Sequence, residues 1–449
     1  MKILICSKLF YPSNRIGAVR PSNFAKYLAE FGHEVTVVTE KNIFEENFTL
    51  PGVKIMRVSN RKLVKKLIDK NTKRVSTNKE KSKGTNQVNN TNPSGKSIKS
   101  KIKQLFTKNR RQIFTLLVEY DWHKSAKQSI KKQYKKNSFD VVISSFGPLS
   151  SFLLGKSVSK LQFANYWISD FRDNMVFDGY PGWLNKLSSN FENYAVKHAH
   201  ALTFVSKGQK AIFLKNNNIT KNQAKKIHIV YNGYEKKISE NSSIKKEENI
   251  LKIAYTGQLY SGVRDFSLLF HVIDDLIEEN LIDSKKVRIE YAGQNSNELK
   301  LQVNKFKHID KICIDYGFVS REKALEIQKG SDILVALTWN TDKEQGILTG
   351  KFLEYLQAQK PIISLTTGDL PNGELSQMVD NLNLGISCEY FNYNDDYSKL
   401  KNYIHKQYNF VIDVKELNFA PDYKKISEFH YEDISKQLMN IINSIARQR

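Results

Sequence analysis

Cysteine is scarce in this chain of 449 residues, and the few that occur show no pairing pattern. Cys6, Cys313 and Cys388 lie far apart, form no C-x-x-C spacing and leave an odd count. Disulfide frameworks and zinc sites need clustered or evenly paired cysteines. We therefore expect the three thiols to be small buried hydrophobic side chains rather than metal ligands or disulfide partners.

Long hydrophobic runs are also lacking. No apolar stretch approaches the ~18 residues that a membrane-spanning helix needs. The apolar start Met1–Ser7 resembles a signal peptide only briefly, because Lys8 interrupts it and no small-residue cleavage site follows. The sequence predicts a cytoplasmic protein. Since neither G-x-G-x-x-G nor G-x-x-x-x-G-K-[ST] occurs, a dinucleotide cofactor and ATP hydrolysis both lack motif support.

Charge of one sign is in excess, with a formal net charge of +24. Between Arg61 and Arg111 there are 17 Lys/Arg against two acids, so this segment carries +15 of that excess. Residues 72–98 contain almost nothing to bury and predict a disordered or mobile loop, whereas its flanks form short basic amphipathic segments. A clustered basic stretch favours an anionic membrane surface or nucleic acid as partner.

Apolar and aromatic residues are sufficient for large cores, with 40% hydrophobic residues, 21 Tyr and 25 Phe. A chain of this length suggests two domains. β-rich runs such as Lys2–Ser7 and Ile253–Gly257 alternate with helical patterns through both halves, on either side of the charged linker 236–249. This alternation predicts two parallel, doubly wound sheets, with a helical last stretch from Lys424 to Arg449.

The segment Gly346–Leu356 combines a loop, a helix start, a lysine and a glutamate. Free N–H groups at a helix N-terminus, with Lys351 in the first turns, suit an anion such as a diphosphate. Glu354, three residues later, points to the same side and could accept from two hydroxyls. A solvated helix start with an i,i+3 ion pair is the competing interpretation, and the eleven residues alone favour neither.

Two further loops follow predicted strands, where doubly wound sheets bind their ligands. In Gly257–Asp265, two glycines allow close approach and Arg264 offers a planar phosphate fork, although a surface Arg–Asp pair would use the same residues. Asp170-Phe171-Arg172-Asp173 places two carboxylates and a guanidinium after a strand. Substrate contact, a structural ion pair and metal binding are all open there, and an Asp-x-x-Asp with an intervening Arg is poor geometry for Mg²⁺.

These pieces, taken in order along nearly the whole chain, resemble the GT-B glycosyltransferases, specifically the large retaining family that builds bacterial polysaccharides (glycosyltransferase family 4-like, group 1). The resemblance lies in nine segments: the opening strand with its Gly17 loop, Phe31–Val37, Asp170–Asp173, Val205–Gln209, Val230–Tyr234, Tyr255–Tyr260, Tyr291–Gly293, Tyr316–Val319 and Thr349–Leu356.

The resemblance implies two Rossmann-like domains facing each other across a cleft, with a basic, partly disordered insertion at about 61–111 in the first. It implies an acceptor-binding domain at 1–235, a nucleotide-sugar-binding domain at 236–424, and a C-terminal helix at about 425–449 that packs back on the first domain. Such a protein is an enzyme that moves a sugar from a nucleotide diphosphate sugar, most simply a UDP-sugar, and needs no metal ion or other cofactor.

The residue roles that the resemblance implies are as follows. Glu354 accepts from the ribose hydroxyls, Arg264 and Lys351 neutralise the diphosphate, and Gly17 lets the first-domain loop close on the phosphates. The amides around Leu348, Thr349 and Gly350 support the β-phosphate and sugar, and Phe318 and Val319 lie against the base. The catalytic candidates are Asp170, which positions the substrate while the leaving phosphate takes the acceptor proton, with Arg172 and Asp173.

One departure affects the sugar. Many members of that family carry two glutamates with seven residues between them, the first of which contacts the donor sugar. The first position is Gly346 here, and Glu344 is out of register, so the sugar cannot be read from this acid.

The leading hypothesis is a cytoplasmic enzyme, peripheral at the inner face of the plasma membrane, that acts on a lipid-linked or growing glycan in capsule or O-antigen synthesis. The alternatives are a nucleotide-sugar epimerase of the same fold, transfer to a soluble or protein acceptor, and a nucleic-acid-binding protein. The last has no RRM, KH, helix-turn-helix or zinc signature to support it.

Overall fold

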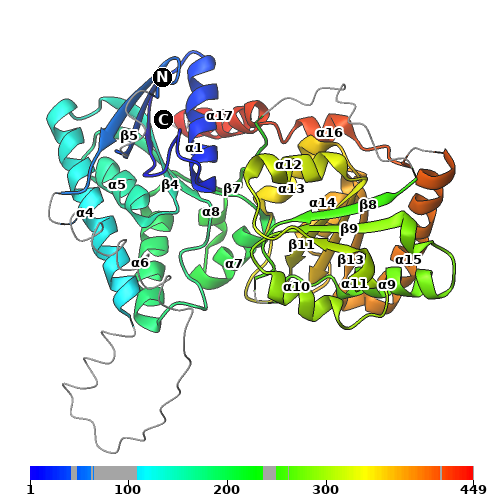
Figure 1. Ribbon diagram of the computed structural model, residues 1–449. Coiled ribbons are helices and arrows are strands. Elements are labelled where there is room, and N and C mark those ends of the chain that lie inside the picture. Colours follow the sequence, from blue (N-terminus) through cyan, green and yellow to red (C-terminus); the bar gives the residue numbers. More distant parts are fainter. Residues whose placement is uncertain are drawn as a thin grey trace, which may run out of the picture. The chain divides into compact units, whose positions relative to one another are not determined.

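The computed structural model describes residues 1–41, 48–61, 64, 109–235, 249–260, 262–414 and 417–447. They form two compact units (Figure 1). Unit 1 comprises Met1–Thr203, Lys221–His228 and Leu438–Arg449, and unit 2 comprises Phe204–Thr220 and Ile229–Gln437. The predicted mobile loop at 72–98 and the linker 236–248 lie outside the described residues, as does all of the basic segment 61–111 except Arg61, Val64 and 109–111.

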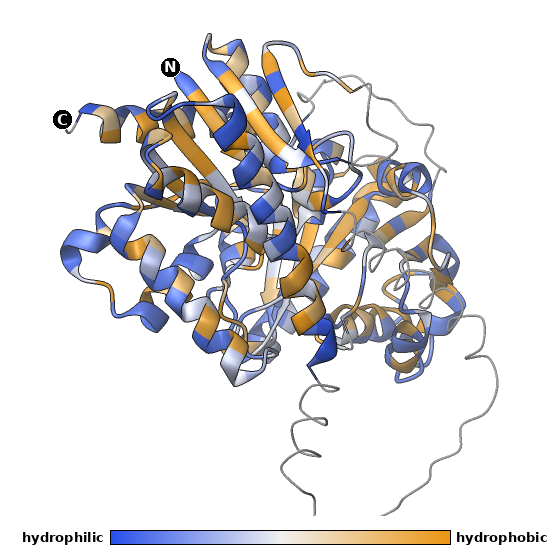
Figure 2. Cartoon of the chain, turned by 90° about the vertical axis from the view of Figure 1, so that its left-hand side faces the viewer, coloured by the Kyte–Doolittle hydropathy of each residue, from blue (hydrophilic) through white to orange (hydrophobic). Residues whose placement is uncertain are grey.

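Unit 1 is built on a seven-stranded sheet in the order β3-β2-β1-β4-β5-β6-β7. The pairings of β1 with β2 and β4, of β2 with β3 and of β4 with β5 are parallel. The central strands are continuous apolar runs, as expected of strands covered on both faces, and Figure 2 shows them as largely hydrophobic ribbons. The strand bounds are β1 Lys2–Cys6, β2 Glu34–Glu40, β3 Val53–Val58, β4 Phe139–Phe146, β5 Ala164–Phe171, β6 Ala201–Phe204 and β7 Ile227–Ile229.

Helices cover both faces of this sheet. The first packs on β2 and β3, whereas the helix that follows β4 packs on β4, β5 and β1, and Figure 1 shows these two on opposite faces. That arrangement follows when the chain reverses direction at β1 and every crossover is right-handed. The helices are α1 Ile16–Glu30, α4 Arg110–Gln133, α5 Leu149–Lys160, α6 Gly182–His198, α8 Lys221–Ala224 and, from Leu438 onward, α17 Tyr431–Arg447.

Unit 2 repeats the plan with a six-stranded sheet in the order β10-β9-β8-β11-β12-β13, and its pairings are parallel. One large buried cluster includes Tyr255 and Phe266 and another includes Phe352 and Tyr355, so both faces are covered. Its strands are β8 Leu251–Thr256, β9 Val287–Ala292, β10 Cys313–Asp315, β11 Ile333–Trp339, β12 Ile362–Thr367 and β13 Gly385–Glu389. Its helices are α7 Lys207–Asn217, α9 Ser267–Glu278, α10 Ser296–Val303, α11 Ile309–Ile312, α12 Arg321–Gly330, α13 Gly350–Ala358, α14 Glu374–Asn381, α15 Tyr393–Asn409, α16 Tyr423–Ser427 and the start of α17.

The prediction of two doubly wound parallel sheets is confirmed. The last stretch is helical as predicted, but it is interrupted, because α16 ends at Ser427 and α17 begins at Tyr431. All three cysteines are free, and Cys6 and Cys388 are buried as predicted while Cys313 is partly exposed. None of the helices in the described part of the chain is long and apolar enough to cross a membrane.

Candidate functional site

The strand order locates a candidate site in unit 2. From β8 the chain proceeds outward to β9 and β10, then returns to place β11 on the other side of β8. Loops that follow β8 and β11 therefore diverge at their carboxyl ends, and the crevice at such a switch point is where doubly wound sheets bind ligands. Arg264 lies in the loop after β8, and Lys351 and Glu354 lie in the helix that follows β11.

Arg264 is a buried cation, with 7% of its surface exposed. Its Nη1 donates to the Tyr255 hydroxyl (3.2 Å) and to the Gln258 carbonyl (3.0 Å), while the guanidinium lies over the rings of Tyr260 (4.4 Å) and Trp339 (5.6 Å). Its Nε has no hydrogen-bond partner among the described residues. The alternative of a surface Arg–Asp pair is wrong. What remains is a fixed guanidinium whose buried Nε–H is unpaired within the described residues, and a buried unpaired donor indicates a missing acceptor.

Glu354 and Lys351 form the ion pair that their spacing predicts, at 2.8 Å between Nζ and Oε2. Oε2 also accepts from Gln328 Nε2 at 3.3 Å, and the same amide donates to Thr256 Oγ1 at 2.8 Å. Gln328 is 1% exposed, so it is a fixed bridge between the end of β8 and the glutamate. The Glu354 side chain is 20% exposed, which leaves part of this supported carboxylate accessible to a hydroxyl ligand.

The loop-to-helix interpretation of Gly346–Leu356 is confirmed. Helix α13 begins at Gly350, with Thr349 as N-cap accepting from the Phe352 N–H, and it ends at Ala358, followed by the C-cap Gln359 in a left-handed conformation. Past Pro361 the chain enters the buried strand β12. The ion pair of the competing interpretation exists as well, but its two side chains are only 33% and 20% exposed, so it is not a freely solvated pair.

The structure explains why residue 346 is a glycine, which the sequence alone did not show. Its φ is +66°, and a Cβ there would lie 2.5 Å from Ser206 Oγ, 2.6 Å from Glu374 Oε2 and 2.7 Å from the Gly208 nitrogen. The carboxylate of Glu374 thus fills the space that a side chain at position 346 would enter. It accepts from the N–H groups of Lys207 (2.8 Å) and Gly208 (2.9 Å) at the start of α7.

The remaining predicted donor residues are placed as follows. Leu348 packs partly buried against the second core cluster of unit 2, as does Val319. Phe318, in the segment between β10 and α12, is 77% exposed, so its ring is open to a partner. The contacts with amides, sugar and base that the resemblance implies for these residues stay predictions.

In unit 1, Asp170 is fully buried at the end of β5. The Arg20 guanidinium donates to both of its oxygens, at 2.8 to 3.2 Å, and the hydroxyls of Ser145 (2.9 Å) and Thr203 (2.7 Å) donate to it as well. Burial alone would raise the pKa of Asp170, but the Arg20 charge and these hydrogen bonds outweigh it and lower the pKa below its usual value. The geometry favours the structural ion pair among the three interpretations left open by the sequence.

Arg172 contacts Gly17, which is the second residue of α1 rather than part of the expected loop. Its Nη1 donates to the Gly17 carbonyl and its Nε to the Phe146 carbonyl at 3.1 Å. A Cβ on Gly17 would lie 2.6 Å from Arg172 Nη1 and 2.8 Å from Leu9 Cδ1, so a larger residue here would displace the ends of these side chains. Desolvation raises the pKa of Asp173, against the opposing charge of Arg172. Arg172 thus ties the start of α1 and the end of β4 to the end of β5.

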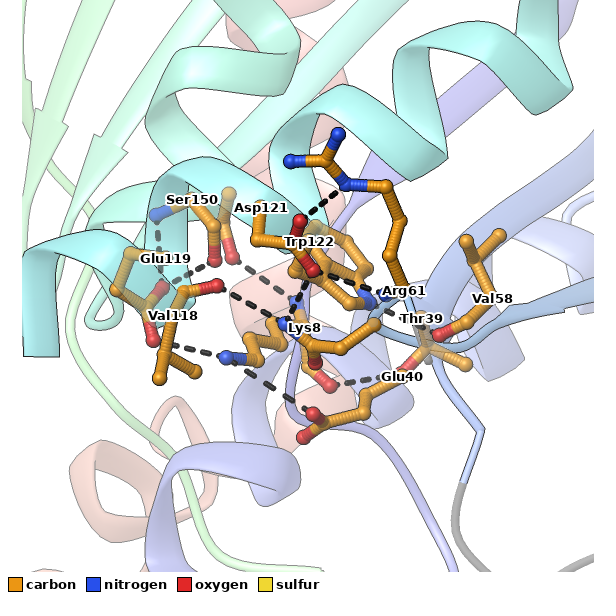
Figure 3. Close-up of polar contacts among 12 residues, drawn as sticks. Lys8, Thr39, Glu40, Val58, Arg61, Val118, Glu119, Asp121, Trp122 and Ser150 are labelled. Carbon is orange, nitrogen blue, oxygen red and sulfur yellow. Dashed lines mark hydrogen bonds and ion pairs between the residues drawn. The ribbon is translucent and has the colours of Figure 1, made fainter. Parts of the chain in front are cut away.

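A second buried network lies at this edge of the unit 1 sheet (Figure 3). Lys8, directly after β1, is 7% exposed, and its Nζ lies 2.8 Å from Glu119 Oε1 and 3.9 Å from Glu40 Oε1. The other oxygen of Glu119 accepts from the N–H and hydroxyl of Ser150 at the start of α5. The pair fixes α4 to β1 and α5. Within the described residues, no three His, Cys, Asp or Glu side chains group closely enough to hold a metal ion.

Five side chains that support these edges were missed by the sequence analysis: Arg20, Tyr260, Gln328, Trp339 and Glu374. The sequence pattern could have identified two of them, Arg20 and Gln328, because each is a polar residue on the buried side of a helix. The aromatic pair and Glu374 reach their partners only through tertiary structure.

No protein-family model matches the chain, and no curated protein sequence is significantly similar to it. Solved structures do match, over the whole chain and at low identity, and they define its class: the chain has the GT-B fold.

Three of these structures illustrate the likeness. Anabaena HepE, solved with UDP-glucose, has a TM-score of 0.56 and 11% identity, with 99% of this chain and 100% of that chain covered. The sucrose-phosphate synthase of Thermosynechococcus elongatus has a TM-score of 0.58 and 12% identity, with 100% and 99% covered. A trehalose-6-phosphate synthase studied with bisubstrate glycomimetics has a TM-score of 0.58 and 11% identity, with 99% of both chains covered.

Proposed function

We propose that this chain is a glycosyltransferase that uses a nucleotide diphosphate sugar, with UDP-sugar as the first candidate. Transfer proceeds with retention, and the acceptor is a lipid-linked or growing glycan of a bacterial surface polysaccharide such as capsule or O-antigen. The enzyme works in the cytoplasm, peripherally at the inner face of the membrane, and the basic segment Arg61–Arg111 contacts anionic lipid.

The observation that carries the proposal is the buried guanidinium of Arg264 with its unpaired Nε–H at the unit 2 switch point. An anion such as a diphosphate oxygen would complete it, and low exposure makes that contact stronger than it would be in water. Lys351 adds a second cation, and Glu354 is a carboxylate already aligned by Gln328 to accept from ribose hydroxyls. Two proteins of similar fold were solved with ligands of this chemical class, HepE with UDP-glucose and an E. coli protein with UDP-2-fluoro glucose.

In the proposed reaction, these residues stabilise the departing diphosphate while positive charge builds on the sugar. Arg264 is already fixed by two rings and two acceptors, so it needs little reorganisation as the charge develops. The leaving phosphate takes the acceptor proton. Asp170 contributes by holding the ends of β4, β5 and β6 together through Arg20, Ser145 and Thr203.

The donor site is tested by thermal unfolding with UDP, GDP, ADP and dTDP. We expect one of these, UDP first, to raise the unfolding temperature. Arg264→Ala and Glu354→Ala should weaken its binding about 10- to 100-fold, because hydrogen bonds to charged groups contribute about 1.5–3 kcal/mol.

Helix α12 offers a matched control. Lys323 and Glu326 form an i,i+3 pair at 3.1 Å like that of Lys351 and Glu354, but both side chains are more than half exposed. Glu326→Ala should leave nucleotide binding unchanged. Wild-type affinity in Arg264→Ala and Glu354→Ala would refute the site, and analysis of products from candidate UDP-sugars would separate glycosyl transfer from epimerisation.

A further inference from the structure

The exposed large apolar side chains of unit 1 are unevenly distributed. Among its described residues, the large hydrophobic side chains that are exposed are Met1, Ile16, Leu117, Phe177, Tyr180 and Trp183. All except Met1 lie at or beyond the carboxyl edge of the sheet. We call these five residues, Ile16, Leu117, Phe177, Tyr180 and Trp183, the apolar edge.

Topology places each of them there. Ile16 begins α1 after β1, and the three aromatic residues lie between the end of β5 and the second residue of α6. Leu117 is in the second turn of α4, two residues before Glu119, which pairs with Lys8 at the end of β1. It therefore lies at the level of the strand ends or past it. In Figure 2 this end of α4 shows an apolar turn beside a hydrophilic first turn.

The aromatic part of the apolar edge is held rigidly in its exposed position. The Phe177 and Tyr180 rings contact each other edge to face at 5.4 Å. The Asn185 side chain bonds both backbone groups of Phe177, at 3.0 and 2.8 Å, and the buried Glu192 accepts from the N–H of Met175 at 2.9 Å. Phe177, Tyr180 and Trp183 nevertheless remain 45%, 43% and 39% exposed. A fixed, clustered apolar surface of this kind marks an interaction site.

The charges around it indicate the kind of partner. Arg15 precedes Ile16, Arg110 and Arg111 precede Leu117 on the same helix, and Lys186 follows Trp183 by three residues on the exposed side of α6. Both acids of α4, Glu119 and Asp121, are buried and paired with cations. The acids of the aromatic loop are Asp173 and Asp178, so cations outnumber acids at this edge. Tyrosine and tryptophan flanked by Arg and Lys suit the interface of a bilayer, where one end of each ring is apolar and the other wet.

We propose that the apolar edge inserts into the interface of an anionic lipid bilayer, with Trp183, Tyr180 and Phe177 at the level of the headgroups. This inference deepens the membrane contact of the proposed function, on which it rests. Without it, attraction of the protein to anionic lipid would depend on the charge of the basic segment alone. The apolar edge adds an apolar anchor, and stable peripheral binding takes two signals, here one electrostatic and one apolar.

Tryptophan fluorescence gives a site-specific test. Trp122 and Trp167 are fully buried, so in a Trp339→Phe background Trp183 is the exposed indole that a lipid can reach. We expect vesicles of phosphatidylcholine and phosphatidylglycerol with brominated acyl chains to quench Trp183. The pair Phe177→Ser/Tyr180→Ser, which keeps that reporter, should reduce vesicle binding by about tenfold or more.

Unit 2 and the opposite edge of unit 1 supply matched controls. Phe391→Ser/Tyr423→Ser removes two side chains that are 54% and 51% exposed, and Lys131→Gln/Lys132→Gln removes two charges from the far end of α4. Both should bind vesicles within about twofold of wild type. Thermal unfolding with UDP on the same variants, made with Trp339 retained, reports separately on folding and on the donor site.

Two outcomes would overturn the proposal. One is vesicle-bound protein in which Trp183 is not quenched, or whose binding survives Phe177→Ser/Tyr180→Ser. The other is quenching of Trp183 by a soluble oligosaccharide but not by vesicles, which would make the edge a sugar-stacking surface. A retained UDP-induced shift in either case would leave the donor-site proposal standing.

Discussion

At the scale of single residues, buried charges hold the candidate sites in place. Asp170 and Arg20 are 0% and 1% exposed and join the helix after β1 to the ends of three neighbouring strands. The sequence placed Asp170 correctly after a strand, where an acid is a reasonable catalytic candidate. It could not show that Arg20, 150 residues away, takes both carboxylate oxygens. A charge partner so distant in sequence leaves no local pattern.

We predict that Asp170→Asn destabilises the protein by about 3–5 kcal/mol at pH 7, because it leaves Arg20 buried without its counter-charge. The folded-state pKa of Asp170 is lowered below the ordinary 3.8. The ionised side chain therefore stabilises the fold fully above pH 3.8, and this stabilisation is lost as pH falls through the folded-state pKa. The stability gap between wild type and variant should therefore narrow in acid. Urea unfolding at several pH values measures it.

The double variant Arg20→Met/Asp170→Leu is the control, since replacing both charges should cost less than removing one. If Asp170→Asn instead unfolds like wild type but abolishes sugar transfer, Asp170 touches substrate and the catalytic interpretation is correct.

At the scale of elements, one carboxylate connects two segments of unit 2. Glu374 bonds the start of α7 and lies beside Gly346 in the loop before α13. Glu374, the first residue of α14, accepts from two amides of α7 and from the Tyr231 hydroxyl at 2.9 Å. Burial and this carboxylate raise the pKa of Tyr231 above its ordinary value, so the phenol stays a donor. From the sequence, Gly346 stood out as a missing acid. The fold shows that an acid from another element already occupies that space.

Gly346→Ala should therefore lower the free energy of unfolding by more than backbone strain alone would. Gly317 has nearly the same φ, +62° against +66°, but a Cβ there would meet nothing within 4 Å. Gly317→Ala should cost about 1–2 kcal/mol for the left-handed conformation alone, and Gly346→Ala about 1–3 kcal/mol more for the clash with Glu374 and Gly208. Urea unfolding of the two variants compares them directly. Equal destabilisation would contradict the crowding.

At the scale of the whole molecule, the chain just before residues 62–108 is hydrogen-bonded to α4, the helix that follows them (Figure 3). Asp121 accepts from the side chain and backbone N–H of Arg61, Asn60 Nδ2 donates to the Val118 carbonyl at 3.0 Å, and the Trp122 indole donates to Val58 at 3.0 Å. The junction between β3 and α4 is thus secured by described residues on either side of 62–108. Those 47 residues carry 14 Lys/Arg and two acids, or twelve of the 24 net positive charges.

We predict that replacing 62–108 by a neutral linker leaves the fold intact. Asn109 lies twelve residues before Asp121, or ~18 Å along α4, so about eight Gly/Ser residues can span the gap. The variant should keep its urea midpoint and UDP-induced thermal shift, but lose most of the salt sensitivity of its binding to anionic vesicles. An unfolded variant would contradict the tied junction, and unchanged salt sensitivity would contradict lipid contact by the segment.

What the sequence determined by itself is local and periodic. Apolar β-branched runs alternating with helical spacing specify two parallel sheets, and the loops after those strands are where doubly wound sheets bind ligands, so the candidate site was expected there. The pairing of Lys351 with Glu354 followed from helical geometry in the same way. Tertiary structure decided how each charge is used. In the folded chain Arg264 is buried against Tyr260 and Trp339, and its Nε–H is unpaired within the described residues. Asp170 forms an ion pair with Arg20. The Glu374 carboxylate fills the space beside Gly346. These partners come from elements distant in the chain, and packing rather than spacing brings them together.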